Sequence, residues 1–204
     1  MSQKSAYRRG RPAPDRSGTH EGDGRAPDEG AEAEPLWLDE SQARIWITFM
    51  QVQLRLSYEM NRQLLSDAQL QLGDYHVLSA LSAAPAGRMQ VSALATYVGW
   101  ERSRMSHHVQ RMADRGLVER AASPSDRRAT DIQLTATGRA AVQSVAPQHV
   151  ALVRRLFFDG LPRELEPGFL AALEGIYQTL VSRGTLAAPP VGPAAATAAD
   201  PPGP

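Results

Sequence analysis

Cysteine is absent from this sequence of 204 residues, and Lys4 is its single lysine. Without cysteine, the chain cannot form disulfides, thiolate metal sites or a cysteine-based redox switch. No apolar segment is long enough to span a membrane, and the basic first residues (MSQKSAYRRGRPAP) lack the apolar core of a signal peptide. We therefore expect a cytoplasmic protein without a membrane-spanning segment.

The common catalytic motifs are missing as well. The sequence contains no nucleophile elbow, phosphate-binding glycine loop, zinc-ligand spacing or convincing carboxylate pair. Adjacent side chains on a helix diverge, so His107 and His108 are poorly placed to share one metal ion. Ser103 and Ser106 lie near His107, but this spacing does not build a catalytic triad. We expect no enzyme activity, no metal site and no cofactor.

Large apolar side chains are scarce at both ends of the chain. Residues 1–35 are rich in proline, glycine and scattered charges, and residues 186–204 consist mostly of Ala, Pro, Gly and Thr. Neither segment can bury enough apolar surface to offset its ordering entropy, so we expect two disordered tails. Residues 36–185 remain, which suffice for one domain with a hydrophobic core.

The stretch from Val91 to Gly138 has the pattern of a helix-turn-helix followed by a β-hairpin wing. A first helix ends at Gly99, and a second is expected from about Glu101 to Arg115, before Gly116. The apolar residues repeat at helical spacing in both, and are Val91, Leu94, Ala95 and Val98 in the first helix and Met105, Val109 and Met112 in the second.

The other face of the second helix has the character of a DNA-contacting surface. It carries only cations and small hydrogen-bonding groups, with no carboxylate between Glu101 and Asp114. A phosphate-lined groove favours such a face. Net charge is zero for the whole chain, yet residues 88–128 hold eight arginines against four acids. The expected DNA-binding residues on this helix are Arg102, Ser103, Arg104, Ser106, His107 and Arg111, although Arg104 has the alternative of reaching a phosphate from the flank.

Two strands with a turn-forming loop between them follow the second helix. The strands are expected to start at Leu117 and to cover residues 129–134, and the loop contains Ser-Pro-Ser-Asp followed by Arg127 and Arg128. An arginine at the tip of such a wing can enter a minor groove. Asp126 is expected to hold the Arg128 guanidinium in position. We therefore add Asp126, Arg127 and Arg128 to the DNA-binding residues.

The run RMADRGLVERAASPSDRRATDIQLTATG resembles the signature of the MarR family of winged-helix regulators. The matching elements are Gly116-Leu117-Val118, Arg120, Asp126-x-Arg128, Ile132-x-Leu134-Thr135 and Gly138, together with Trp100-Glu101-Arg102-Ser103 upstream. This resemblance covers about residues 36–185. It implies a homodimer that binds double-stranded DNA, represses transcription and responds to a small aromatic effector.

The flanking segments are expected to be helices. One begins at Asp39 or Ser41 and runs to about Leu65; a short one covers Tyr75–Ala83 after an Asp74 cap, preceded by a linker at residues 70–73. A long helix begins at Thr135, with a kink or break at Pro147, and a last helix covers about residues 168–183. The fold class is thus mainly α with a small β-wing: a winged module at about residues 75–135, and dimerisation helices at about 39–65 and 135–183.

Five aromatic residues are candidates for an effector pocket: Trp46, Tyr58, Tyr75, His76 and Trp100. For each of them, a place in an ordinary core or interface is an open alternative. A winged-helix module for protein interaction, without DNA binding, is the alternative for the whole protein. An enzyme fragment is set aside because these residues contain no cofactor-binding βαβ unit.

Overall fold

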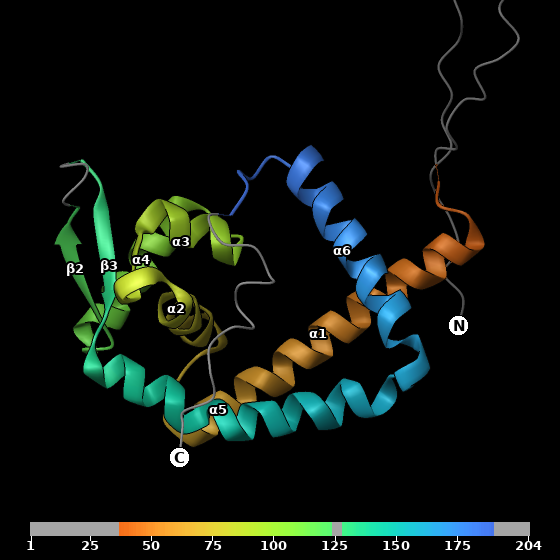
Figure 1. Ribbon diagram of the computed structural model, residues 1–204, viewed down its shortest axis with the longest axis horizontal. Coiled ribbons are helices and arrows are strands. Elements are labelled where there is room, and N and C mark those ends of the chain that lie inside the picture. Colours follow the sequence, from red (N-terminus) through yellow and green to blue (C-terminus); the bar gives the residue numbers. More distant parts are fainter. Residues whose placement is uncertain (1–36, 124–127, 190–204) are drawn as a thin grey trace, which may run out of the picture.

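A computed structural model describes residues 37–123 and 128–189. It is mainly helical with one small sheet, which confirms the expected fold class (Figure 1). In chain order the elements are α1 (Glu40–Ala68), α2 (Leu72–Ala83), η1 (Pro85–Gly87), β1 (Arg88–Gln90), α3 (Val91–Val98), α4 (Arg102–Asp114), β2 (Val118–Ala122), β3 (Thr130–Leu134), α5 (Ala136–Leu156), η2 (Phe158–Gly160), η3 (Arg163–Leu165) and α6 (Glu166–Arg183).

The winged module has the predicted helix-turn-helix and the two predicted wing strands, to which β1 adds a third strand. Its antiparallel sheet has the order β1-β3-β2, with Met89 opposite Ile132 and Arg120 also opposite Ile132. Gly99 and Gly116 follow the two helices with positive φ angles of 74° and 70°, which glycine adopts without steric cost. The apolar side of α4 is fully buried in the main core, at Met105, Val109 and Met112.

Two helix starts follow from capping chemistry. The Asp39 carboxylate accepts from the Gln42 N–H at 2.8 Å, and the Thr135 hydroxyl accepts from the Gly138 N–H at 2.9 Å. The start of α2 was expected too late. Asp74 lies inside the first turn and accepts from the backbone N–H of Gln71 at 3.0 Å, so the helix begins at Leu72 and not after Asp74.

Of the kink or break expected at Pro147, α5 shows no break. The helix continues through Pro147 from Ala136 to Leu156. A proline removes one helical N–H, but packing of α5 against α1 and α2 supports both halves. Val145 before the proline and Leu152 after it are both buried. Helix α5 thus connects the winged module to the C-terminal helices without a break.

Large apolar side chains stay exposed on α1 and α6. Figure 1 shows α6 and the N-terminal part of α1 extending away from β2 and β3. No residue of α6 is buried within the described chain, and Leu170, Ile176 and Leu180 are more than half exposed. No helix among the described residues is long and apolar enough to cross a membrane.

Candidate nucleic-acid interface

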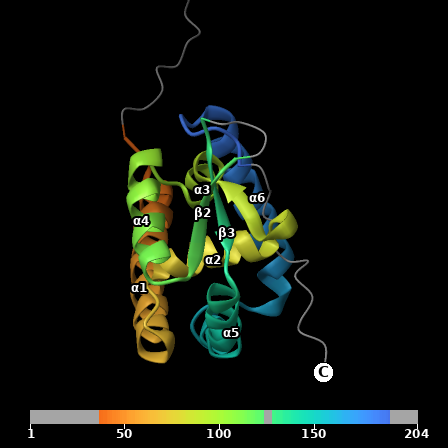
Figure 2. The ribbon, with the colours of Figure 1, turned by 90° about the vertical axis from the view of Figure 1, so that its left-hand side faces the viewer.

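Helix α4 lies beside the β2–β3 hairpin in Figure 2, and the polar face of α4 is open to solvent. Six of the predicted DNA-binding residues occupy this helix. Five are exposed and Ser106 is partly exposed; in chain order they are Arg102, Ser103, Arg104, Ser106, His107 and Arg111. The opposite face is anchored in the core, so the fold holds these side chains on a rigid support.

Two of these arginines have contacts within the chain. The Arg104 guanidinium lies 4.1 Å from the centre of the Trp100 ring, in a cation–π arrangement at the start of α4. Arg111 places a guanidinium nitrogen 3.1 Å from Nδ1 of His108, one turn earlier on the same helix. Arg104 is therefore held near the start of α4, whereas Arg111 lies in the last turn of the helix.

The wing is tied to α4 by a polar chain of contacts. Arg120 on β2 donates to the side-chain oxygen of Gln110, and Gln110 donates to Asp114 at 2.9 Å. Arg128 is exposed in the turn two residues before β3. Asp126 and Arg127 lie outside the described residues, so the expected Asp126–Arg128 pairing stays a prediction.

A buried ionic cluster under α4 was not predicted. Asp74 of α2 is 2% exposed; its Oδ2 accepts from Arg115 at 2.6 Å, and its Oδ1 lies 3.0 Å from Nε2 of His108. Burial raises the pKa of Asp74, but the His108 imidazole, hydrogen bonds from Gln71 and Arg115 and the charge of Arg115 outweigh this effect, and the pKa falls from 3.8 to about 2. The carboxylate is thus ionised and fastens α4 to α2.

Sequence spacing gave no signal for this cluster. Asp74 and Arg115 are 41 residues apart, and each has a local explanation at a helix end. His108 is 4% exposed, with the Trp100 ring edge-on at 5.0 Å.

The five effector-pocket candidates do not gather in one place. Trp46 and Tyr58 are exposed on α1, and Trp100 packs against His108. Tyr75 stacks on His149 of α5 with ring centres 4.4 Å apart. Burial raises the pKa of Tyr75 and lowers that of His76, while burial and the nearby His76 lower the pKa of His149. These α2 and α5 side chains are therefore uncharged at neutral pH.

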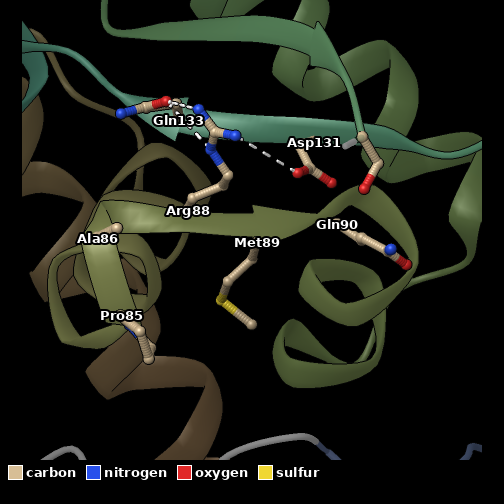
Figure 3. Close-up of a pocket in the computed structure, with 8 residues that line it drawn as sticks. Pro85, Ala86, Arg88, Met89, Gln90, Asp131 and Gln133 are labelled. Carbon is tan, nitrogen blue, oxygen red and sulfur yellow. Dashed lines mark hydrogen bonds and ion pairs between the residues drawn. The ribbon is translucent and has the colours of Figure 1, made fainter. Parts of the chain in front are cut away.

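Two hollows lie elsewhere on the surface. One, of about 350 Å³, opens beside β1, where Arg88 donates to Gln133 at 3.1 Å and lies 3.9 Å from Asp131 (Figure 3). The other, of about 550 Å³, lies between α5 and the start of α6, with His149 in its wall. None of the five candidates lines either hollow. Tyr75 contacts His149, and His149 lines the second hollow.

Comparisons with known proteins agree with this geometry. A family model described as the MarR family matches residues 68–129, which span α2, the helix-turn-helix and most of the wing. A search of curated proteins found no match.

Solved structures are similar over most of the described chain. Sco3205, a MarR family transcriptional regulator from Streptomyces coelicolor solved in complex with DNA, is 32% identical, with a TM-score of 0.68 over 77% of this chain and 97% of that one. AbsC, a MarR family transcriptional regulator from the same organism, is 35% identical, with a TM-score of 0.68 over 73% and 100%. BpsR of Bordetella bronchiseptica, whose DNA binding is regulated by 6-hydroxynicotinic acid, shares the fold at 20% identity, with a TM-score of 0.58 over 66% and 98%. Helix α4 is basic and exposed on a winged fold, and the sequence identity to Sco3205 and AbsC extends over nearly the whole length of those two regulators. The chain therefore belongs to the MarR family of DNA-binding transcriptional regulators.

Proposed function

We propose that the protein is a homodimeric repressor that binds a pseudo-palindromic operator. Each subunit places α4 in a major groove and the wing arginines Arg127 and Arg128 in the adjacent minor groove. The exposed face of α4 carries this proposal, because it presents positive and hydrogen-bonding side chains and no carboxylate from Arg102 to Arg111 at a surface held rigid by the core. Binding that blocks a promoter represses transcription.

The exposed apolar faces of α1 and α6 support the dimer. Phe49 and Trp46 on α1 and Ile176 on α6 are between 47% and 58% exposed within one chain. Water contact with so much apolar surface is unfavourable, and a second copy of the chain would cover it. Two-fold symmetry then sets two α4 helices about one DNA turn apart, about 34–36 Å.

The binding test starts from duplexes selected by the purified wild-type protein out of a random-sequence pool. We expect an enriched two-fold symmetric motif, nanomolar affinity and a steep dependence on salt. Arg111→Ala should weaken binding about tenfold and relax preference at one base pair, whereas Arg128→Ala should reduce the salt slope by about one.

Arg62→Ala is the matched control. Arg62 is an exposed arginine on α1 whose contact is a surface ion pair with Glu59 at 3.4 Å, so its loss should leave affinity nearly unchanged. Equal binding to all duplexes, unaffected by Arg111→Ala, would instead favour a winged-helix module for protein interaction.

For the effector, we propose a small uncharged aromatic molecule that binds near Tyr75 and His149. The support is the hollow of about 550 Å³ beside His149 and the uncharged state of the aromatic side chains next to it. A panel of phenols and aromatic amides, added to the protein–DNA complex, should contain compounds that release DNA. Tyr75→Ala should lose the response while its DNA affinity stays intact; equal release from both proteins would place the effector elsewhere.

A further inference from the structure

The Asp74 cluster continues into the DNA-facing surface through one histidine. His108 lies between a buried carboxylate and an exposed guanidinium: its Nε2 is 3.0 Å from Oδ1 of Asp74, and its Nδ1 is 3.1 Å from a terminal nitrogen of Arg111. Asp74 is buried on α2, and Arg111 is exposed on α4. A line of polar contacts therefore runs from the interior to the groove-facing side.

The chemistry of arginine determines the protonation of the imidazole. A guanidinium has only donors, so Nδ1 of His108 must accept the hydrogen bond and carries no proton. The ring proton then resides on Nε2, which faces the Asp74 carboxylate at 3.0 Å. The N–H direction is off the ideal hydrogen-bond line, so this contact is mainly electrostatic, but it favours the same tautomer.

Packing leaves the ring little freedom. His108 is 4% exposed, the Trp100 indole lies edge-on at 5.0 Å, and a Cβ added at Gly73 would lie 3.2 Å from the imidazole and 2.7 Å from the indole. Arg115 and the Gln71 N–H hold the other carboxylate oxygen of Asp74. The Nδ1 atom of His108, which accepts from Arg111, is thus fixed relative to the helix-turn-helix.

We propose that Asp74 and His108 are positioning residues for DNA recognition, which orient Arg111 toward the base edges before DNA arrives. This inference rests on the proposed groove contact of α4. An arginine side chain has many rotamers, and ordering it on binding reduces affinity. A guanidinium already held by His108 loses less freedom, and its planar fork is presented in one orientation. The buried pair therefore acts on sequence preference through Arg111 without touching DNA.

The test is a double-mutant cycle on the duplex selected by the wild-type protein. His108→Leu removes both ring contacts but keeps an apolar side chain of similar size, and His108→Gln retains a donor and an acceptor. We expect His108→Leu to weaken binding about tenfold, to relax preference at the same base pair as Arg111→Ala, and to add nothing when Arg111 is already alanine. His108→Gln should restore most of the affinity and the preference.

A second cycle supplies the matched control. His108→Leu combined with Arg128→Ala should give the product of the two losses, because the wing arginine is not oriented by His108. Thermal unfolding of each variant separates a fold defect from a recognition defect: Gln and Leu variants of equal stability but unequal base preference support the positioning role.

Several results would overturn the inference. Losses that multiply to about a hundredfold in the His108→Leu, Arg111→Ala protein would show that the two residues act independently. Tighter binding by His108→Leu would show that the histidine holds Arg111 away from DNA. Wild-type protein that binds all duplexes equally would overturn the groove contact of α4 and this inference together, whereas multiplicative losses on a selected duplex overturn the positioning role alone.

Discussion

Replacing Asp74 with asparagine removes the charge of a carboxylate that links α2 to α4. The side chain keeps its size and can still accept from the Gln71 N–H, so the change tests the charge itself. In the folded protein the pKa is about 2, against an ordinary value of 3.8. That difference corresponds to about 2 kcal/mol of stability at neutral pH, which Asp74→Asn should lose.

The effect of pH has a defined sign. A carboxyl group with a lowered pKa in the folded state contributes its full stability above pH 3.8 and loses it as the pH falls toward 2. The stability gap between wild type and Asp74→Asn should be constant from about pH 7 to pH 5 and then shrink by about 1 kcal/mol by about pH 3. Other carboxylates titrate in both proteins and cancel in the difference.

Urea unfolding followed by circular dichroism, at one fixed protein concentration, measures this gap at about pH 7, 5, 4 and 3. A gap that stays constant down to the lowest pH would refute the proposed source of stability, since an ionised Asp74 would then not be involved. Equal stability of the two proteins at neutral pH would show that desolvation of Asp74 cancels its ion pair with Arg115.

Three further predictions concern the packing of helices. Gly138→Ala should destabilise the fold by at least about 2 kcal/mol, because the added Cβ would lie 2.0 Å from the carbonyl oxygen of Leu117, and thermal unfolding will measure the loss. Gly175→Ala, with nothing within 4 Å of the added carbon, should stabilise α6 by up to about 1 kcal/mol in the same assay. Leu173→Glu on α6 should convert a dimer into a monomer of 22.1 kDa in light scattering; an unchanged dimer would exclude this face from the interface.

The sequence predicted what depends on neighbours along the chain. Met105, Val109 and Met112 repeat at helical spacing, and this local pattern alone identifies the buried side of α4 and hence its exposed basic side. Gly99 and Gly116 marked the helix ends because their positive φ angles are local requirements. The helix-turn-helix and its candidate DNA-facing residues therefore follow from local sequence pattern.

The Asp74–Arg115 contact was missed because it joins residues far apart in the sequence. Asp74 lies near a helix start, where a carboxylate has a local capping use, so its partner Arg115 across the fold left no trace in the spacing. The apolar residues of α6 have the periodicity of a buried face, but within one chain none is buried. Periodicity identifies which side of a helix is apolar, and it cannot identify which chain covers that side.

Helix α5 runs without a break from the winged module to the C-terminal region, so a bend within α5 changes the position of one region relative to the other. With 21 residues it is about 30 Å long, and nine residues, about 14 Å, follow Pro147. Without an N–H at position 147 the helix bends there more easily than elsewhere, and a bend of about 10° would displace its far end by about 2 Å.

Pro147→Ala, which restores the N–H, should therefore narrow the range of half-site separations that a dimer accepts in a spacing series of operators. An unchanged range of accepted separations would mean that α5 does not bend at Pro147. If Pro147→Ala narrows the range, one proline in α5 sets how much variation in half-site separation the dimer accepts.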